Sequence, residues 1–300
     1  MLELINLTKV FKTGMFSSGR LKAVNNVSFK IEEGEVTSLI GESGSGKSTI
    51  GKMILRLLTI TEGEIRLDGR DISGLKGAEL RDYYRKVQGV FQDPFSSYNP
   101  IFKVDRVFEN LRSVFFAKMH YSDWMDKVHT VLKLVGLDPD QILGKYPHQL
   151  SGGQLQRILI SRALLLDVNF LVADELISML DASTRIDVLN LLADLKKKGL
   201  SILFITHDLS LGYYLSERAV ILFKGHVVEM GRTDKVFFNP QHYYTCKLLS
   251  SVPRLDKKWE DIESDHKKKI DGRKCFDPIM DAEHEMVEVE EDHYVAVQRR

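Results

Sequence analysis

The chain has 300 residues, of which 43% are apolar and 28% charged, as is typical of a folded globular protein with room for one large domain and an appendage. Its 42 basic and 42 acidic residues give a net charge of +0, so no basic excess points to nucleic acid or to an anionic membrane surface. A membrane-spanning helix needs ~20 consecutive apolar residues, whereas the most apolar stretch of this chain, 158–180, is interrupted by charges. The N-terminus lacks the pattern of a signal peptide. The two cysteines, Cys246 and Cys275, are too few for a disulfide framework. We therefore expect a cytosolic chain that reaches a membrane only through partners.

The first part of the chain is rich in predicted strands, at 2–5, 24–29 and 35–40. A polar loop that contains glycine separates the first two of these strands, at 13–21. Apolar residues at helical spacing, from Ile50 to Leu58, predict a helix after the third strand. Strand character then returns over 62–92.

The middle of the chain, from about 104 to 150, has the pattern of helices. Ser122 is expected to cap one of these helices, and Gly136 is expected to end it in the left-handed conformation. Three alternations of helix and strand follow and end near Val228. Their strands, such as 202–206, are almost entirely apolar, which indicates a parallel sheet buried on both faces. The fold class is therefore predicted to be α/β.

The C-terminal part differs in composition from the rest. A helix is expected to end at 250–253, and a charged stretch follows to about Lys274. Residues 286–289 and 294–297 alternate in polarity around an acidic turn, as a small β-hairpin would. A disordered acidic tail is the alternative interpretation of this last segment.

A phosphate-binding loop is predicted at 41–49, where GESGSGKST lies between a strand and a helix, the context that this motif requires. Its glycines let backbone N–H groups approach the β- and γ-phosphates, and the N-terminus of the helix adds a partial positive charge. Lys47 would place its charge on the same oxygens, and Ser48 would offer its hydroxyl to Mg²⁺. The residues of this loop that we expect to bind ATP are Gly41, Ser43, Gly44, Ser45, Gly46, Lys47, Ser48 and Thr49.

Two carboxylates end the apolar strand 170–174. Asp174 would hold the coordination shell of Mg²⁺, and Glu175 would act as general base toward the attacking water. Taken alone, an apolar strand that ends in two carboxylates is more often a structural feature than a catalytic one. With a phosphate loop upstream, it predicts a site of ATP hydrolysis.

The segment 150–154 reads LSGGQ and begins a long predicted helix. Ser151 followed by two glycines is a capped helix N-terminus with bare backbone amides, which is a site for an anion. LSGGQ is also the signature of ATP-binding-cassette ATPases, and the chain resembles that family over residues 1 to about 230.

The resemblance implies roles for further residues. Gln92 would be the Q-loop glutamine, which also contacts Mg²⁺, and His207 would be the switch histidine; Phe11 would stack on adenine. Two cassettes would close head to tail around two ATP molecules, and each would contact the nucleotide of the other through Ser151, Gly152, Gly153, Gln154 and the D-loop residue Asp181. Catalysis, mostly by positioning and electrostatics, would fall to Glu175, His207, Lys47 and Gln92.

One branch of the family is indicated more closely. The run QDPFSSYNP at 92–100 is similar to that of oligopeptide and dipeptide importer ATPases, and 239–253 and 288–297 resemble the C-terminal extension of that branch. The resemblance implies a P-loop NTPase core, with a mostly parallel sheet and an antiparallel N-terminal β subdomain, within a domain at 1–234. It also implies an α-helical signature subdomain at about 93–165 and an importer-type extension at 235–300.

Cofactors and partners follow from the same resemblance. ATP and Mg²⁺ would bind, with a second and distinct ATPase subunit as heterodimer partner, two transmembrane permease subunits and an extracytoplasmic solute-binding protein; no nucleic acid is expected. The chain would lie on the cytoplasmic face of the cell membrane, held by the permeases. Its cargo would be oligopeptides or dipeptides, or alternatively oligosaccharides or other solutes that this branch carries.

The sequence departs from the branch at three places. Tyr243 stands where proline is usual. Some relatives carry a cluster of cysteines in this region that holds an iron–sulfur centre. Only Cys275 is present here, so no iron–sulfur centre is expected. Leu176-Ile177 replaces Pro-Thr, which frees a backbone angle at the start of the D-loop. Glu175 and Asp181 are retained, so hydrolysis should persist.

Two other classes of function remain open at this stage. In a soluble cassette ATPase of DNA repair, long coiled coils separate the motifs, whereas roughly 60 residues separate Gln92 from Ser151 here. Translation factors of the family join two cassettes in one chain, and this sequence has one. A binding module without hydrolysis conflicts with the presence of Lys47, Asp174, Glu175 and His207.

Overall fold

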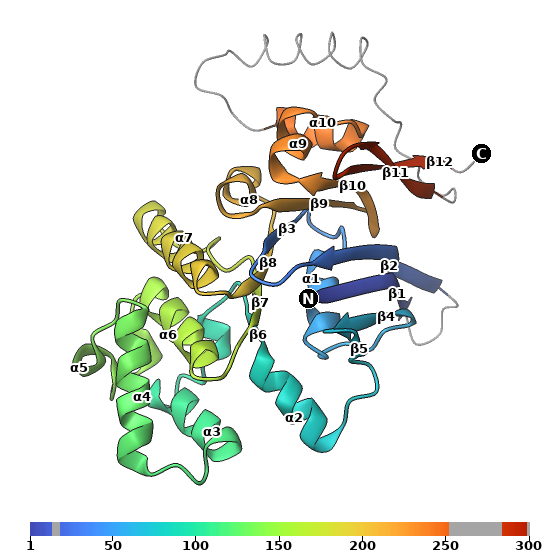
Figure 1. The fold of residues 1–300 in the computed structure, drawn as a ribbon. Coiled ribbons are helices and arrows are strands. Elements are labelled where there is room, and N and C mark those ends of the chain that lie inside the picture. Colours follow the sequence, from blue (N-terminus) through green and yellow to red (C-terminus); the bar gives the residue numbers. More distant parts are fainter. Residues whose placement is uncertain (14–18, 252–283, 299–300) are drawn as a thin grey trace. The chain divides into compact units, whose positions relative to one another are not determined.

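The computed structural model describes residues 1–13, 19–251 and 284–298 (Figure 1). The chain divides into two compact units, Met1–Leu75 with Leu203–Arg300, and Lys76–Ile202. Strands and helices alternate in both, which confirms the predicted α/β class. No helix of the described ranges is both long and apolar enough to cross a bilayer. The predicted domain boundaries, 1–234 and 235–300, stay a prediction.

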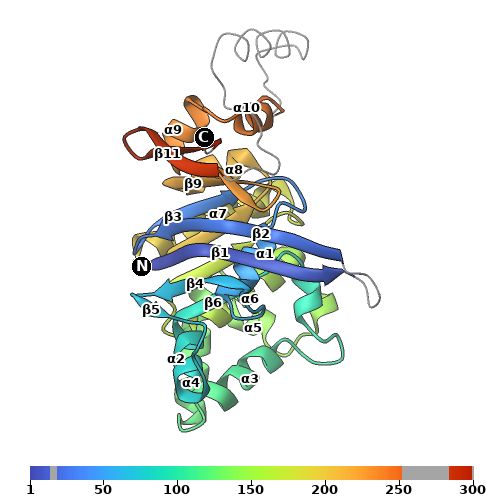
Figure 2. The same cartoon turned by 90° about the vertical axis from the view of Figure 1, so that its right-hand side faces the viewer.

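The first unit contains a four-stranded antiparallel sheet in the order β2-β1-β4-β5. Figure 2 shows β1, β2 and β4 of this sheet side by side. Alternate residues of β1, such as Leu2 and Leu4, are buried, so one face of the strand packs into the hydrophobic core. The expected antiparallel N-terminal β subdomain is therefore present. Its strands are β1 (Leu2–Thr13), β2 (Gly19–Ile31), β4 (Glu62–Leu67) and β5 (Arg70–Asp71).

The second sheet of this unit has the order β11-β12-β10-β9-β3-β8. The pairing of β3 with β9 is parallel, whereas β9, β10, β12 and β11 pair antiparallel in succession. The predicted C-terminal hairpin is confirmed, and it extends the core sheet through β12 instead of forming an acidic tail. The strands are β3 (Val36–Ile40), β8 (Ser201–Thr206), β9 (Arg218–Phe223), β10 (His226–Arg232), β11 (His284–Glu290) and β12 (His293–Gln298).

Four helices among the described residues of this unit are α1 (Lys47–Ile54), α8 (Leu209–Leu215), α9 (Thr233–Phe238) and α10 (Tyr243–Ser250). The helix expected to extend from Ile50 to Leu58 ends earlier. Arg56 has a φ of 57°, which breaks the helix, and Leu57 is 58% exposed. The expected helix end near 250 is confirmed by α10. Helices α8, α9 and α10 bury apolar side chains in a common core cluster with β3, β9 and β10.

The second unit contains two parallel strands, β6 (Val87–Val90) and β7 (Phe170–Asp174). The strand character predicted over 62–92 is wrong at 77–86, which form helix α2 (Gly77–Lys86), a mostly polar helix in which Tyr83 is the only buried residue. The predicted cap at Ser122 is wrong: α4 begins at Tyr121, so Ser122 lies in the first turn, where its hydroxyl contacts the side chains of His120 and Asp123. Gly136 has a φ of 73°, which confirms the predicted left-handed end. The helices are α2 (Gly77–Lys86), α3 (Asp105–Phe115), α4 (Tyr121–Leu134), α5 (Pro139–Ile142), α6 (Gly152–Leu164) and α7 (Ala182–Lys197), with 3₁₀ turns η1 (Phe95–Ser97) and η2 (Pro147–Gln149).

Candidate functional site

The loop 41–46 joins β3, which is buried at every position, to the start of α1 at Lys47. Gly44 and Gly46 have φ values of 81° and 108°, a region that favours glycine. A Cβ atom on Gly46 would lie 2.5 Å from the carbonyl oxygen of Ala23, and one on Gly41 would overlap the carbonyl oxygen of Leu222. Close backbone approach therefore requires glycine at 41 and 46, and the positive φ favours it at 44.

Lys47 is 5% exposed, and its ammonium lies across this loop. Its Nζ donates to the carbonyl oxygens of Gly41 at 2.7 Å and of Glu42 at 2.8 Å. Ser48 and Thr49 are half-buried in the first turn of α1, where backbone N–H groups and the helix dipole favour an anion. The loop thus gathers one cation and several N–H donors, which is the chemistry of a phosphate site.

A tyrosine that the sequence interpretation did not assign to the site contacts the same loop. The N–H of Glu42 donates to Oη of Tyr244 at 3.0 Å, although the two residues are 202 positions apart. Tyr244 belongs to α10 and its ring packs against that of Phe223, with 4.2 Å between ring centroids and a tilt of 33°. Burial raises the pKa of its phenol to about 12, so the group is neutral at physiological pH. The only signal in the sequence was the resemblance of 239–253 to the importer extension.

Phe11 and His207 also lie in the first unit. Phe11 is half-buried on β1, and the ammonium of Lys9 lies 5.2 Å from the centroid of its ring. His207 is exposed in the bend after β8, which is closed by a 3.0 Å hydrogen bond from the Asp208 N–H to Oγ1 of Thr206. Contact of Phe11 with adenine and of His207 with the reacting phosphate stay predictions.

The predicted carboxylate pair lies in the second unit. Asp174 is the buried last residue of β7, and Glu175 is half-buried directly after it. Glu175 has a φ of 47°, a conformation that costs a non-glycine residue about 1–3 kcal/mol and often marks a functional position. Leu176 and Ile177, which replace the usual Pro-Thr, are buried, so this apolar pair anchors the turn that follows Glu175 in the core.

The LSGGQ segment forms the start of α6. Ser151 is the N-cap, as predicted: its Oγ accepts the N–H of Gln154 at 3.2 Å, and Oε1 of Gln154 accepts the N–H of Ser151 at 2.9 Å. Gly152 and Gly153 follow, and a Cβ atom on Gly153 would overlap the methyl group of Thr184 on α7. Gly153 therefore allows α6 to lie close to α7, and the two glycines leave backbone N–H groups uncovered by side chains of their own.

Asp181 caps α7. Its carboxylate accepts hydrogen bonds from the hydroxyl of Ser183 at 2.6 Å and from the N–H and hydroxyl of Thr184 at 3.0 and 2.8 Å. These bonds hold the pKa of Asp181 well below its usual range. Its predicted contact with a nucleotide of the partner subunit stays a prediction.

Side chains of α6 hold the segment that carries Gln92, which is exposed after β6. Gln156 donates to the carbonyl oxygen of Phe91 at 3.3 Å, and Arg162 donates to that of Gly89 at 2.9 Å. Burial lowers the pKa of the Arg162 guanidinium. The signature helix and the Q-loop of this unit are therefore joined by hydrogen bonds from two side chains of α6.

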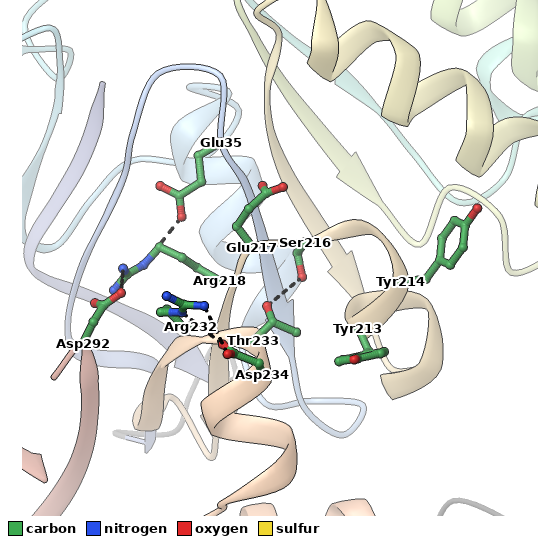
Figure 3. Close-up of a pocket in the computed structure, with 10 residues that line it drawn as sticks. All are labelled: Glu35, Tyr213, Tyr214, Ser216, Glu217, Arg218, Arg232, Thr233, Asp234 and Asp292. Atoms are coloured by element: carbon green, nitrogen blue, oxygen red, sulfur yellow. Dashed lines mark hydrogen bonds and ion pairs between the residues drawn. The ribbon is translucent and has the colours of Figure 1, made fainter. Parts of the chain in front are cut away.

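A cavity of about 670 Å³ lies where the turn of the C-terminal hairpin meets β9 (Figure 3). Arg218 lies between two carboxylates, 2.6 Å from Oδ2 of Asp292 and 3.6 Å from Oε1 of Glu35. Arg232 pairs with Asp234 at 3.1 Å. Because these charges are paired with one another, they anchor the hairpin to the sheet and offer little catalytic chemistry.

Comparison with known families and sequences shows which proteins the chain is similar to. Residues 24–178 match the family described as ABC transporter, and residues 228–275 match the oligopeptide/dipeptide transporter, C-terminal region. The chain is 42% identical to the oligopeptide transport ATP-binding protein OppF of Streptococcus mutans, over 98% of this chain and 94% of that protein. It is 43% identical to the dipeptide transport ATP-binding protein DppF of Lactococcus lactis subsp. cremoris, over 98% and 92%.

Solved structures agree in fold. The ATP-binding cassette MJ0796 bound to ADP and Pi superposes with a TM-score of 0.69 at 32% identity, covering 78% of this chain and 99% of that one. The fold and the loop at 41–49 define a P-loop nucleotide-binding protein, and the chain belongs to the ATP-binding-cassette (ABC) transporter family. It is an ATP-hydrolysing subunit of that family, as the motifs predicted.

Proposed function

We propose that the chain energises an ABC importer of peptides. The C-terminal region is the observation that supports peptides as the cargo, because residues 228–275 match the oligopeptide/dipeptide transporter region. In addition, relatives that align over nearly the full chain are named for oligopeptide and dipeptide transport. The segment that begins this region is ordered as β10, α9 and α10 in the first unit. No observation favours oligosaccharides over peptides.

Within this proposal the loop 41–49 binds the phosphates of ATP, with Lys47 on the β- and γ-phosphate oxygens and Phe11 against adenine. Support comes from the fold of the loop, in which the Lys47 ammonium is already held 2.7 Å from the carbonyl oxygen of Gly41. The hydroxyls of Ser48 and Thr49, at the start of α1, would complete the phosphate and metal contacts.

Ser48, Asp174 and Gln92 would hold Mg²⁺. All three offer oxygen donors, the ligand type that this hard cation prefers, and Asp174 is a buried carboxylate at a strand end. Mg²⁺ neutralises charge on the phosphates when it is bound. Glu175 would take the proton of the water that attacks the γ-phosphorus, while the bond from that phosphorus to ADP breaks and inorganic phosphate leaves. His207 would orient the same water.

The active form would contain two cassettes. Ser151, Gly152, Gly153 and Gln154, at the start of α6, would contact the γ-phosphate bound by a second, distinct ATPase subunit, and Asp181 would lie at the same interface. Two permease subunits would hold the pair at the cytoplasmic face of the cell membrane, and a solute-binding protein outside would deliver the peptide.

The test is reconstitution in liposomes of this chain with a second ATPase subunit and two permease subunits of the same transport system. ATP hydrolysis by the complex should be slow and should rise several-fold with peptide-loaded binding protein, with uptake of labelled peptide inside the liposomes. Binding protein without peptide and a complex that carries Lys47→Ala are the controls. Stimulation by a saccharide-loaded binding protein alone would contradict the cargo, and purification of the chain without any permease would contradict the role in transport.

A further inference from the structure

One peptide unit of the phosphate loop is held from both sides. The carbonyl oxygen of Gly41 accepts a hydrogen bond from Lys47 at 2.7 Å, and the N–H of the same peptide unit, that of Glu42, donates to Oη of Tyr244 at 3.0 Å. A peptide unit is planar, so a bond that fixes the N–H also fixes the direction of the carbonyl group. The direction of this carbonyl in turn helps to set where the Lys47 ammonium lies.

The two bonds also reinforce each other. A cation on the carbonyl oxygen polarises the amide and makes its N–H a stronger donor, and an acceptor on the N–H makes the carbonyl oxygen a stronger acceptor. Lys47 is buried, so its attraction to this oxygen is screened less than it would be in water. Tyr244 is therefore coupled to the charged residue of the loop through one amide group.

Tyr244 is itself held rigidly. It is 4% exposed, its ring packs against Phe223, and its backbone N–H donates to Nδ1 of His242 at 3.1 Å. The N–H of His242 donates to the fully buried carboxylate of Glu229 at 3.0 Å. Glu229 also contacts Nε2 of His293, on the C-terminal hairpin, at 2.7 Å. The phenol oxygen is thus placed by the start of α10, which the hairpin braces.

We propose that Tyr244 is a positioning residue of the ATP site: it orients the Gly41–Glu42 peptide so that Lys47 is held ready for the β- and γ-phosphates. The C-terminal extension then belongs to the nucleotide site as well as to the importer branch. This inference rests on the proposed assignment of the loop 41–49 to ATP phosphates.

The decisive variant is Tyr244→Phe, which deletes the phenol oxygen and keeps the ring against Phe223. The dissociation constants of ATP and ADP should rise about three- to tenfold, the range for one lost hydrogen bond. Hydrogen–deuterium exchange at the Glu42 amide should accelerate, and the thermal midpoint without nucleotide should stay within about 2 °C. Tyr243→Phe is the matched control: it removes the same atom one residue earlier on α10. Among the described residues the Tyr243 hydroxyl makes no hydrogen bond to the loop, so this variant should leave all three quantities unchanged.

Two results would overturn the inference. One is nucleotide affinity within twofold of the unmodified chain in Tyr244→Phe; the other is an equal loss of affinity in Tyr243→Phe. A fall in the thermal midpoint with unchanged affinity would assign Tyr244 to core packing only. Lys47→Ala separates this inference from the assignment of the loop. If ATP binding survives Lys47→Ala, the phosphate site itself is wrong; if Lys47→Ala abolishes binding and Tyr244→Phe does not weaken it, only the role of Tyr244 is wrong.

Discussion

Acid should destabilise the start of α10 through His242. Nδ1 of His242 accepts the N–H of Tyr244 at 3.1 Å, so this nitrogen must be unprotonated, and the residue is only 1% exposed. Burial lowers the pKa of His242 from 6.5 to about 4, against the opposing effect of the Glu229 carboxylate and with a small further decrease from His284. Between these two values the unfolded chain binds more protons than the folded chain, so stability is lost as the pH falls from 6.5 to 4. At about 1.4 kcal/mol per pKa unit, the loss reaches about 3 kcal/mol at pH 4.

The variant His242→Asn isolates this contribution, because an asparagine oxygen can still cap the helix and does not titrate. The free energy of unfolding in urea would be measured for the unmodified chain and for the variant from pH 4 to 7.5. The difference should move by about 3 kcal/mol in favour of the variant across that range. His293 acts in the opposite sense: burial lowers its pKa, but hydrogen bonds to Glu229 and Glu290 outweigh this effect and raise it, so its contribution is lost as the pH rises. Because His293 is present in both proteins, its contribution largely cancels, and a difference that does not change with pH would refute the reasoning.

Three further predictions concern the second unit. Glu175→Gln should reduce turnover of the assembled complex at least ~100-fold with ATP affinity unchanged, because an amide cannot take the proton of the attacking water; unchanged turnover in steady-state assays would remove Glu175 as the base. Gly153→Ala should lower the free energy of unfolding by about 1–3 kcal/mol, since the new Cβ meets the methyl group of Thr184. Adding Thr184→Ser, which deletes that methyl and keeps the hydroxyl, should restore most of the loss, and failure to do so would place the strain elsewhere. Tyr98→Phe should cost about 1 kcal/mol in urea unfolding, because the carbonyl of Leu155 loses a 2.9 Å buried hydrogen bond; an unchanged midpoint would show that the bond contributes nothing.

The local elements that sequence periodicity predicted well are those in which burial is strong. Strand β8 is buried at every position, and it was recognised as an apolar run. Helix α2 escapes prediction because its residues are mostly polar and only Tyr83 is buried, so it lacks the apolar residues that mark a helix packed on a core. The cap was misplaced at Ser122 because its hydroxyl bonds to neighbouring side chains inside the first turn, a contact that competes with capping. Capping at Ser151 was predicted correctly, since the reciprocal partner Gln154 lies three residues later in the same motif.

The sequence by itself determined the family, the α/β class and the residues expected at the ATP site, because each motif is a short contiguous segment at the end of a strand or the start of a helix. The backbone at such a position dictates which side chains and N–H groups meet a phosphate, so spacing alone carries that information. Only the tertiary structure decided that Tyr244 contacts the N–H of Glu42, since 202 positions separate the two residues and no local pattern encodes their approach. It also decided that the C-terminal hairpin pairs with β10, where Glu229 and His293 are buried together. Contacts of this kind depend on which faces the sheet brings together, and that is a property of the whole fold.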